Sequence, residues 1–104
     1  MMHLLKLLFQ LFGKSTMTNN AITPPREGHE SIAGTPWLAR MLDKARLKHE
    51  GTIDHFDLVY PCPMDQRLLE QLQVSSDTFQ QIAIDNTTDN AVVDALKEAG
   101  AKLA

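Results

Sequence analysis

After residue 35 the apolar side chains recur at helical spacing, in short runs separated by proline, glycine and capping residues. The clearest run shares one helix face and consists of Trp37, Leu38, Met41, Leu42 and Ala45. Such an i, i+1, i+4, i+5, i+8 pattern is typical of an amphipathic helix. Thr35 fits the N-cap, Pro36 the first helical position and Gly51 the stop, so we expect a helix over 36–49.

A second main helix is predicted to begin at Pro63, because proline favours the first helical position. Cys62 then occupies the N-cap, and Asp65 lies in the first turn, where its charge meets the positive end of the helix dipole. The expected buried face consists of Met64, Leu68, Leu69 and Leu72.

Two more helices complete the predicted bundle. Ser75 is a favourable N-cap for a helix over 76–84, and Thr88 for a helix over 89–99. Residues 52–61 read as an extended connection with alternate apolar side chains pointing inward, and no second strand is evident to pair with it. The predicted fold is therefore all-α, a small bundle of about four helical segments with one extended connection between the first and second main helices.

The chain before these helices divides into a tail over 1–24 and the start of a single helical domain over 25–104. Residues 26–34 predict a short helical turn ended by Gly34. The tail begins MMHLLKLLFQLFG, which is too short to span a bilayer and lacks the pattern of an export signal. Either it is an amphipathic helix that contacts a membrane surface or a partner, or translation begins at Met17. We favour the start at Met17 because the polar face is thin.

Charge and cysteine content exclude several classes of protein. The 104 residues carry 10 basic and 13 acidic side chains, and one cysteine precludes an intramolecular disulfide. Basic residues predominate up to residue 49 and acidic residues after it, so two faces or two chains can neutralise each other. The acidic second half disfavours nucleic-acid binding. We expect a cytoplasmic protein with no transmembrane segment.

Three blocks of the sequence resemble a family of bacterial proteins. They are Pro25-Arg26-Glu27, the helix Trp37-Leu38-Ala39-Arg40-Met41-Leu42-Asp43-Lys44-Ala45-Arg46, and Cys62-Pro63-Met64-Asp65-Gln66-Arg67-Leu68-Leu69. From Pro25 to Leu96 the chain is similar to the family of domain of unknown function 5069, although Ala39 stands where the family pattern has proline. The resemblance implies a small, cytoplasmic, helical bacterial domain, and it implies no activity.

Cys62 is the candidate nucleophile. At a helix N-cap a thiolate is stabilised by backbone N–H groups, and His55 is a candidate general base seven residues upstream. The charge of Asp65 opposes a thiolate in the same turn. We therefore favour a packed capping residue over a catalytic cysteine.

Ligand-type side chains gather in the loop after the first main helix. The weak metal candidates are His49, Asp54, His55 and Asp57. Imidazole and carboxylate groups suit zinc, iron or manganese, but no recognised metal-binding spacing is present. We expect a solvated acidic loop, with no metal and no cofactor.

The binding candidates are charged residues: Arg26, Arg40, Asp43, Lys44 and Asp65, with Arg46 beside them. We favour a structural role in which Arg26 docks on Asp43 or Asp65 as a bidentate pair that fixes the N-terminal arm. The alternative is an anion site formed by Arg26, Arg40, Lys44 and Lys48. Trp37 is expected to be the buried aromatic anchor of the core.

Two functions remain from these patterns. The first is a non-enzymatic helical interaction or regulatory module that binds a protein partner or a second copy of itself. The second is a small enzyme or ligand or anion binder that uses Cys62, His55 and the Arg26/Arg40 face. The first is favoured because no catalytic signature is present. The rate of iodoacetamide labelling of Cys62 distinguishes the two.

Overall fold

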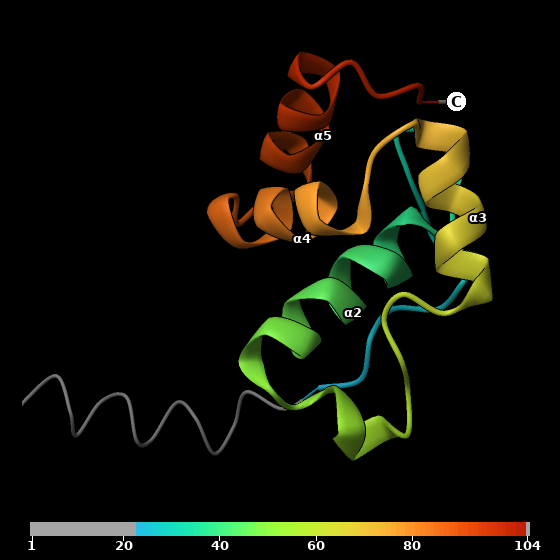
Figure 1. Ribbon diagram of the computed structural model, residues 1–104, viewed down its shortest axis with the longest axis vertical. Coiled ribbons are helices and arrows are strands. Elements are labelled where there is room, and N and C mark those ends of the chain that lie inside the picture. The colour runs from blue at the N-terminus through green and yellow to red at the C-terminus, as the bar shows by residue number, and fades with distance from the viewer. Residues whose placement is uncertain (1–22, 104) are drawn as a thin grey trace, which may run out of the picture.

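The computed structural model describes residues 23–103, and this part of the chain is mostly helical (Figure 1). Its four α-helices confirm the predicted all-α class. They are α2 (Leu38–Glu50), α3 (Pro63–Leu72), α4 (Ser76–Asp85) and α5 (Asp89–Glu98). No helix among these residues is long and apolar enough to cross a membrane. The predictions for residues 1–22, including the amphipathic helix and the start at Met17, lie outside the described residues.

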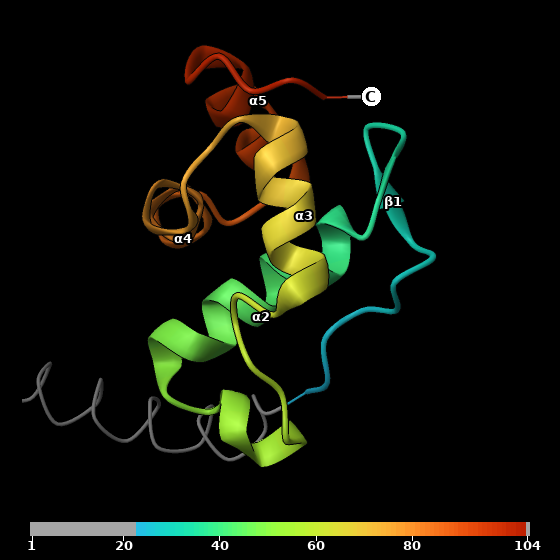
Figure 2. The same ribbon diagram turned by 45° about the vertical axis from the view of Figure 1, so that its right-hand side comes forward.

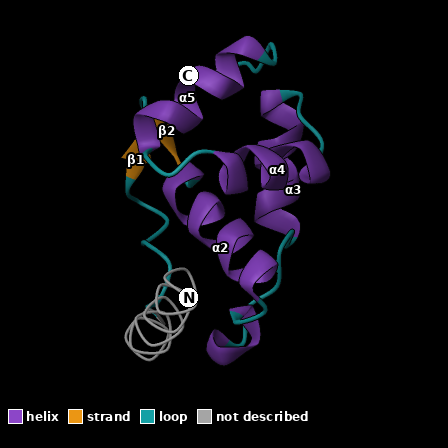
Figure 3. Ribbon diagram, turned by 90° about the vertical axis from the view of Figure 1, so that its left-hand side faces the viewer, coloured by secondary structure: helices purple, strands orange, loops and turns teal. Residues whose placement is uncertain are grey.

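Helix α2 is the centre of the packing. It makes its most extensive contacts with α4, and α3 lies beside both (Figures 1 and 3). The fully buried apolar side chains of the core come from all four helices: Leu38, Met41, Leu42, Ala45, Leu72, Phe79, Val92 and Leu96. After α5 the chain returns toward α3, where the Lys102 N–H donates to the Leu72 carbonyl.

Local capping explains where the helices begin and end. The Ser75 hydroxyl accepts from the Thr78 N–H, and the Thr88 hydroxyl accepts from the Ala91 N–H, each at 3.1 Å. Gly51 ends α2 with a φ of 79°, a left-handed conformation that glycine adopts without steric cost. The predicted caps at these three positions are confirmed.

A small hairpin replaces the short helical turn predicted for residues 26–34, so that prediction is wrong (Figure 2). Strands β1 (Ser31–Ile32) and β2 (Thr35–Pro36) pair antiparallel, which also corrects the expectation of no sheet. Ala33 and Gly34 between them have φ values of 52° and 74°. Two successive positive φ values define the tight turn whose twist matches a two-stranded hairpin.

The hairpin also changes the start of the first main helix. Thr35 was predicted as the N-cap, but it pairs with Ile32 in the sheet, so the helix begins at Leu38, two residues after its predicted start. Trp37 takes the N-cap position instead, with a left-handed φ of 72°. Its backbone N–H donates to the Gly28 carbonyl at 2.9 Å, which ties the arm before the hairpin to the helix.

The connection between α2 and α3 is only partly extended. It contains the 3-10 helix η1 (Ile53–Phe56), which corrects the prediction of an extended segment throughout. The alternation expected at its end is present, because Leu58 is half-buried, Val59 exposed and Tyr60 buried. Met64 was expected on the buried face of α3, but 44% of it is exposed.

Candidate functional site

The most deeply buried charges of the described chain form one ion pair. Lys44 of α2 and Asp65 of α3 have 2% and 0% of their side chains exposed, and Lys44 Nζ lies 2.7 Å from Asp65 Oδ2. By helical spacing, Arg40, Lys44 and Lys48 form an i, i+4, i+8 row, which predicts that Lys44 lies on the polar side of its helix. Its burial corrects this, since the side chain turns inward to meet a carboxylate 21 residues away in sequence.

Asp65 accepts two further hydrogen bonds. Trp37 Nε1 donates to Oδ1 at 2.8 Å, and the Cys62 backbone N–H donates to Oδ2 at 3.0 Å. The second bond caps the N-terminus of α3 from within its first turn. Trp37 is only half-buried, so the prediction of a buried core anchor is corrected: the ring packs against the edge of the core while its N–H donates to Asp65.

Cys62 is the fourth member of this cluster. Its Sγ accepts a hydrogen bond from Lys44 Nζ at 3.2 Å, and its side chain is half-buried at the N-cap of α3. The candidate base His55 is exposed on η1, and its ring lies beside Phe56 at a centroid distance of 6.4 Å. The contacts of Cys62 therefore join it to the ion pair rather than to His55.

A second network, more open to water, is centred on Arg26. Its guanidinium binds Asp43 of α2 and Asp89 of α5, with closest contacts of 2.9 and 2.8 Å. These hydrogen bonds raise the pKa of Arg26 further above its usual value and lower the pKa of Asp89. Asp43, one of the two predicted partners, is thus in contact with Arg26, while the other, Asp65, pairs with Lys44.

Arg40 supports the same arm. Its Nη1 donates to the Arg26 carbonyl at 3.0 Å, and its guanidinium carbon lies 5.6 Å from the centroid of the Trp37 ring, as in a cation–π contact. Arg26 and Lys44, two of the four residues of the hypothetical anion site, already bind carboxylates. The structure therefore does not assemble that site as an open set of cations.

The candidate metal ligands remain on the surface. All four side chains are exposed: His49, Asp54, His55 and Asp57. Within residues 23–103 no group of three or more His, Cys, Asp or Glu side chains is placed to hold a metal ion. The geometry of these residues gives the metal hypothesis no support.

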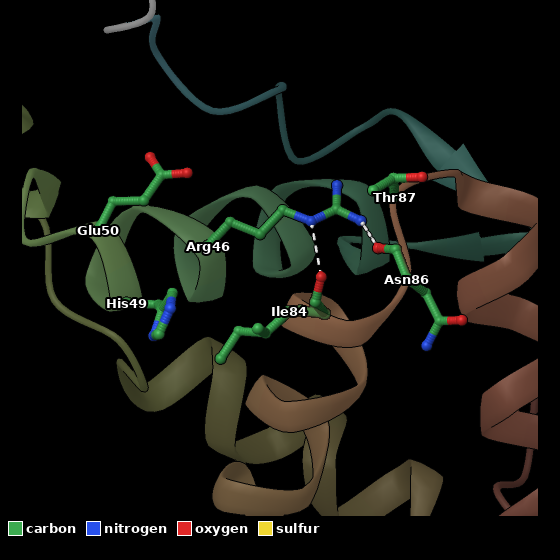
Figure 4. Close-up of a pocket in the computed structure, with 7 residues that line it drawn as sticks. Arg46, His49, Glu50, Ile84, Asn86 and Thr87 are labelled. Carbon is green, nitrogen blue, oxygen red and sulfur yellow. Dashed lines mark hydrogen bonds between the residues drawn. The ribbon is translucent and has the colours of Figure 1, made fainter. Parts of the chain in front are cut away.

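A pocket that the sequence did not indicate lies where the end of α2 meets the loop after α4 (Figure 4). Its volume is about 300 Å³, and it is lined by Arg46, His49, Glu50, Ala83, Ile84, Asn86 and Thr87. Arg46 is anchored there because Nε donates to the Ala83 carbonyl and Nη2 to the Asn86 carbonyl. Arg46 was visible as part of a basic cluster, but only folding brings it to a loop 40 residues away.

The fold and its two ion-pair networks define a small helical domain whose N-terminal arm is fastened to α2. The three sequence blocks singled out above meet in these networks, since Arg26, Lys44 and Asp65 each come from a different block. The chain belongs to the family of domain of unknown function 5069, whose model matches residues 22–103. No curated protein matches this chain at a significant level.

Proposed function

We propose that the protein is a non-catalytic helical module that binds a protein partner through residues 58–64, termed the docking segment. The observation that carries the proposal is Val59, an apolar side chain with 65% of its surface exposed. Met64, with 44% exposed, is the other large apolar side chain that the described part of the chain leaves exposed. Contiguous apolar surface marks interaction sites, and these two exposed side chains lie five residues apart in one segment.

The backbone of the docking segment is fixed by contacts on either side of Pro61. Tyr60 is buried, and its hydroxyl donates to the Ser76 carbonyl at 3.0 Å. Cys62 is held by Asp65 and Lys44. Little conformational freedom is then lost when Val59 and Met64 are covered, which favours binding. An open groove of about 500 Å³ adjoins the segment at Pro61 and extends along α3 to the start of α4.

The charge of the exterior indicates the chemistry of the partner. The lysine and arginine side chains from residue 26 to residue 46 are all buried or half-buried, so this stretch of the chain does not form a basic face. The exposed cations of residues 23–103 are Lys48, Arg67, Lys97 and Lys102. Ten exposed carboxylates outnumber them: Glu27, Glu30, Glu50, Asp54, Asp57, Glu70, Asp77, Asp85, Asp94 and Glu98. An apolar patch rimmed with lysine and arginine would complement this surface.

Native mass spectrometry of the untagged, full-length protein purified from its own host tests the proposal. We expect the wild type to carry a second polypeptide, either another protein or a second copy. The Val59→Ser/Met64→Ser variant is expected to be a bare monomer. The matched control is Gln81→Ser/Lys97→Ser, which changes two exposed side chains on α4 and α5 and is expected to keep the complex. A complex that survives in the Val59/Met64 variant, or a wild type that is a bare monomer, overturns the proposal.

The proposal includes a cytoplasmic location in a bacterial cell. It is supported by the single cysteine, which is free in the structure, and by the family resemblance. The alternative of a small enzyme has weaker support, because Cys62 contacts Lys44 and Asp65 rather than the candidate base His55. The rate at which iodoacetamide alkylates Cys62 tests that alternative.

A further inference from the structure

Two exposed charges of opposite sign flank the docking segment. Asp57 ends η1 directly before the segment, and Arg67 lies on α3 three residues after Met64. Both side chains are exposed, and neither forms an ion pair within residues 23–103. We term four of these side chains the exposed strip, which in chain order is acidic, apolar, apolar and basic: Asp57, Val59, Met64 and Arg67.

The two apolar side chains of the exposed strip lie on the same side of the docking segment. Side chains alternate over residues 58–60, and the Tyr60 hydroxyl donates to Ser76, which lines the groove beside α3. Val59 is therefore directed away from that groove. Gln66 of α3 also lines the groove, and two residues of an α-helix turn by about 200°, so Met64 lies on the opposite side of the helix from Gln66.

The two charges extend this apolar pair at its two ends. Met64 and Arg67 are neighbours on the helix surface, because residues three apart lie on one face. Asp57 lies two residues before Val59, at the end of η1. In Figure 2 the chain runs from η1, near one end of the molecule, to the start of α3. The carboxylate and the guanidinium therefore belong to opposite ends of the exposed strip.

We infer that the exposed strip binds the same strip of a second copy, so that the protein forms a dimer with two-fold symmetry. In a two-fold interface every contact is made twice with the roles exchanged. Val59 then packs on the partner's Met64, and Asp57 pairs with the partner's Arg67. The second copy is the partner required by the proposed function, on which this assignment rests.

Charge order favours a second copy in this orientation. The ten exposed carboxylates of the described residues favour a partner whose apolar patch carries a cation, and Met64 with Arg67 is such a patch. An antiparallel alignment of two strips pairs opposite charges at both ends, whereas a parallel alignment pairs like charges. Two large apolar side chains from each copy make a small interface, so we expect a dissociation constant of about micromolar order.

Charge reversal tests this arrangement by sedimentation equilibrium of the full-length protein. We expect the wild type to dimerise, and Asp57→Arg or Arg67→Asp alone to dimerise at least about tenfold more weakly, since two attractions become repulsions. An equimolar mixture of the two variants restores both attractions. Its heterodimer, identified by mass in native mass spectrometry, is expected to have an affinity within about threefold of the wild type. A dimer unaffected by either reversal, or a mixture without recovery, overturns the inference.

The matched controls reverse two exposed charges of α5 that lie outside the exposed strip. Asp94→Arg and Lys97→Asp are expected to leave dimerisation unchanged, alone or mixed. Asp57→Asn serves as a variant that keeps the fold, because asparagine tolerates the left-handed φ of 55° at this position. It removes two attractions and is expected to weaken the dimer about threefold. An undiminished dimer in Asp57→Asn contradicts the inference.

The possible outcomes separate the second copy from the proposed function. A wild type that is monomeric in isolation, yet carries a different protein when purified from its host, overturns the second copy and leaves the docking segment as a binding surface. A dimer that persists in Val59→Ser/Met64→Ser overturns both, because the docking segment is then not the contact surface.

Discussion

Two ion-pair regions fasten α2 to the rest of the molecule, and they differ in their exposure to water. The Lys44–Asp65 pair is almost completely buried between α2 and α3. The Arg26–Asp43–Asp89 network links the N-terminal arm to α2 and α5, and its three side chains are 31%, 23% and 41% exposed. The same kind of contact therefore operates in two different dielectric environments.

The comparison shows what each region contributes. A buried pair gains little net stability because both charges lose their hydration, but it is costly to break, since the remaining partner is left charged and unpaired. A pair open to water also contributes little net stability. It is weakened by salt, and removing one partner costs little because the other stays hydrated. We therefore expect the Lys44–Asp65 pair to determine how α2 and α3 dock, and the Arg26 network to hold the arm weakly.

Removing Lys44 tests the buried region and has the largest expected effect. Lys44→Met leaves the Asp65 carboxylate without its cation, so we expect the free energy of unfolding to fall by about 3–5 kcal/mol. Urea denaturation followed by circular dichroism measures the change. The expected loss does not depend on salt, because the pair has no contact with bulk water.

The double variant Lys44→Met/Asp65→Asn separates charge burial from packing. Asparagine removes the unpaired charge and keeps an oxygen for Trp37 Nε1. We expect the double variant to be more stable than Lys44→Met alone. If it is less stable, losing the acceptor of the Cys62 N–H costs more than removing the unpaired charge gains, and the contrast between the two regions does not hold.

Trp37→Phe sharpens the comparison within the buried region. Phenylalanine retains most of the ring that covers Gly28, and it removes the N–H that binds Asp65 Oδ1 at 2.8 Å. A buried acceptor without its donor costs about 1–3 kcal/mol, so we expect a loss of that order in urea denaturation. A loss below about 0.5 kcal/mol would indicate that water replaces the indole N–H.

Local signals explain why much of the fold could be predicted. Ser75, Thr88 and Gly51 act through hydrogen bonds or backbone angles within a few residues, so their roles are readable from the sequence. The hairpin was missed because each strand has only two residues, too few to show alternation. Its turn also places Ala33, a residue with no special preference for positive φ, in the left-handed region.

The candidate site was harder to predict because it depends on contacts far apart in sequence. Lys44 fitted an exposed row on its helix, and only Asp65, 21 residues later, draws it inward. For the same reason, the choice between Asp43 and Asp65 as the partner of Arg26 could not be made from spacing. Glu50 and Thr87 have no sequence pattern that places them around one pocket.

The Arg26 network is expected to respond to acid through Asp89. Arg26 lowers the pKa of Asp89, so the stability from this contact is present above the unfolded pKa, near about 4, and is lost as the pH falls through the lower folded value. We expect Asp89→Asn to destabilise the protein by less than about 1 kcal/mol at pH 7. Between roughly pH 5 and pH 2, the span of the Asp89 titration, the variant is expected to lose less stability than the wild type. Urea denaturation at each pH measures both quantities, and parallel profiles for the two proteins would contradict this assignment.

Labelling of Cys62 tests whether the thiol beside the buried ion pair is chemically accessible. Of all the changes proposed, this labelling is expected to have the smallest effect on stability. Cys62 Sγ is half-buried and accepts the hydrogen bond from Lys44, so we expect iodoacetamide to modify it slowly at pH 7. The matched control is Cys62→Ser/Ser75→Cys, which places the only cysteine at an exposed N-cap, that of α4, with no buried lysine beside it.

We expect the cysteine at position 75 to react faster than Cys62, because both lie at helix N-caps and position 75 is the more exposed. Mass spectrometry of the intact protein over time gives both rates. If Cys62 reacts faster despite its burial, the Lys44 ammonium activates the thiol. The buried pair would then be part of a reactive centre, and the enzyme alternative would replace the binding module as the better account of this cluster.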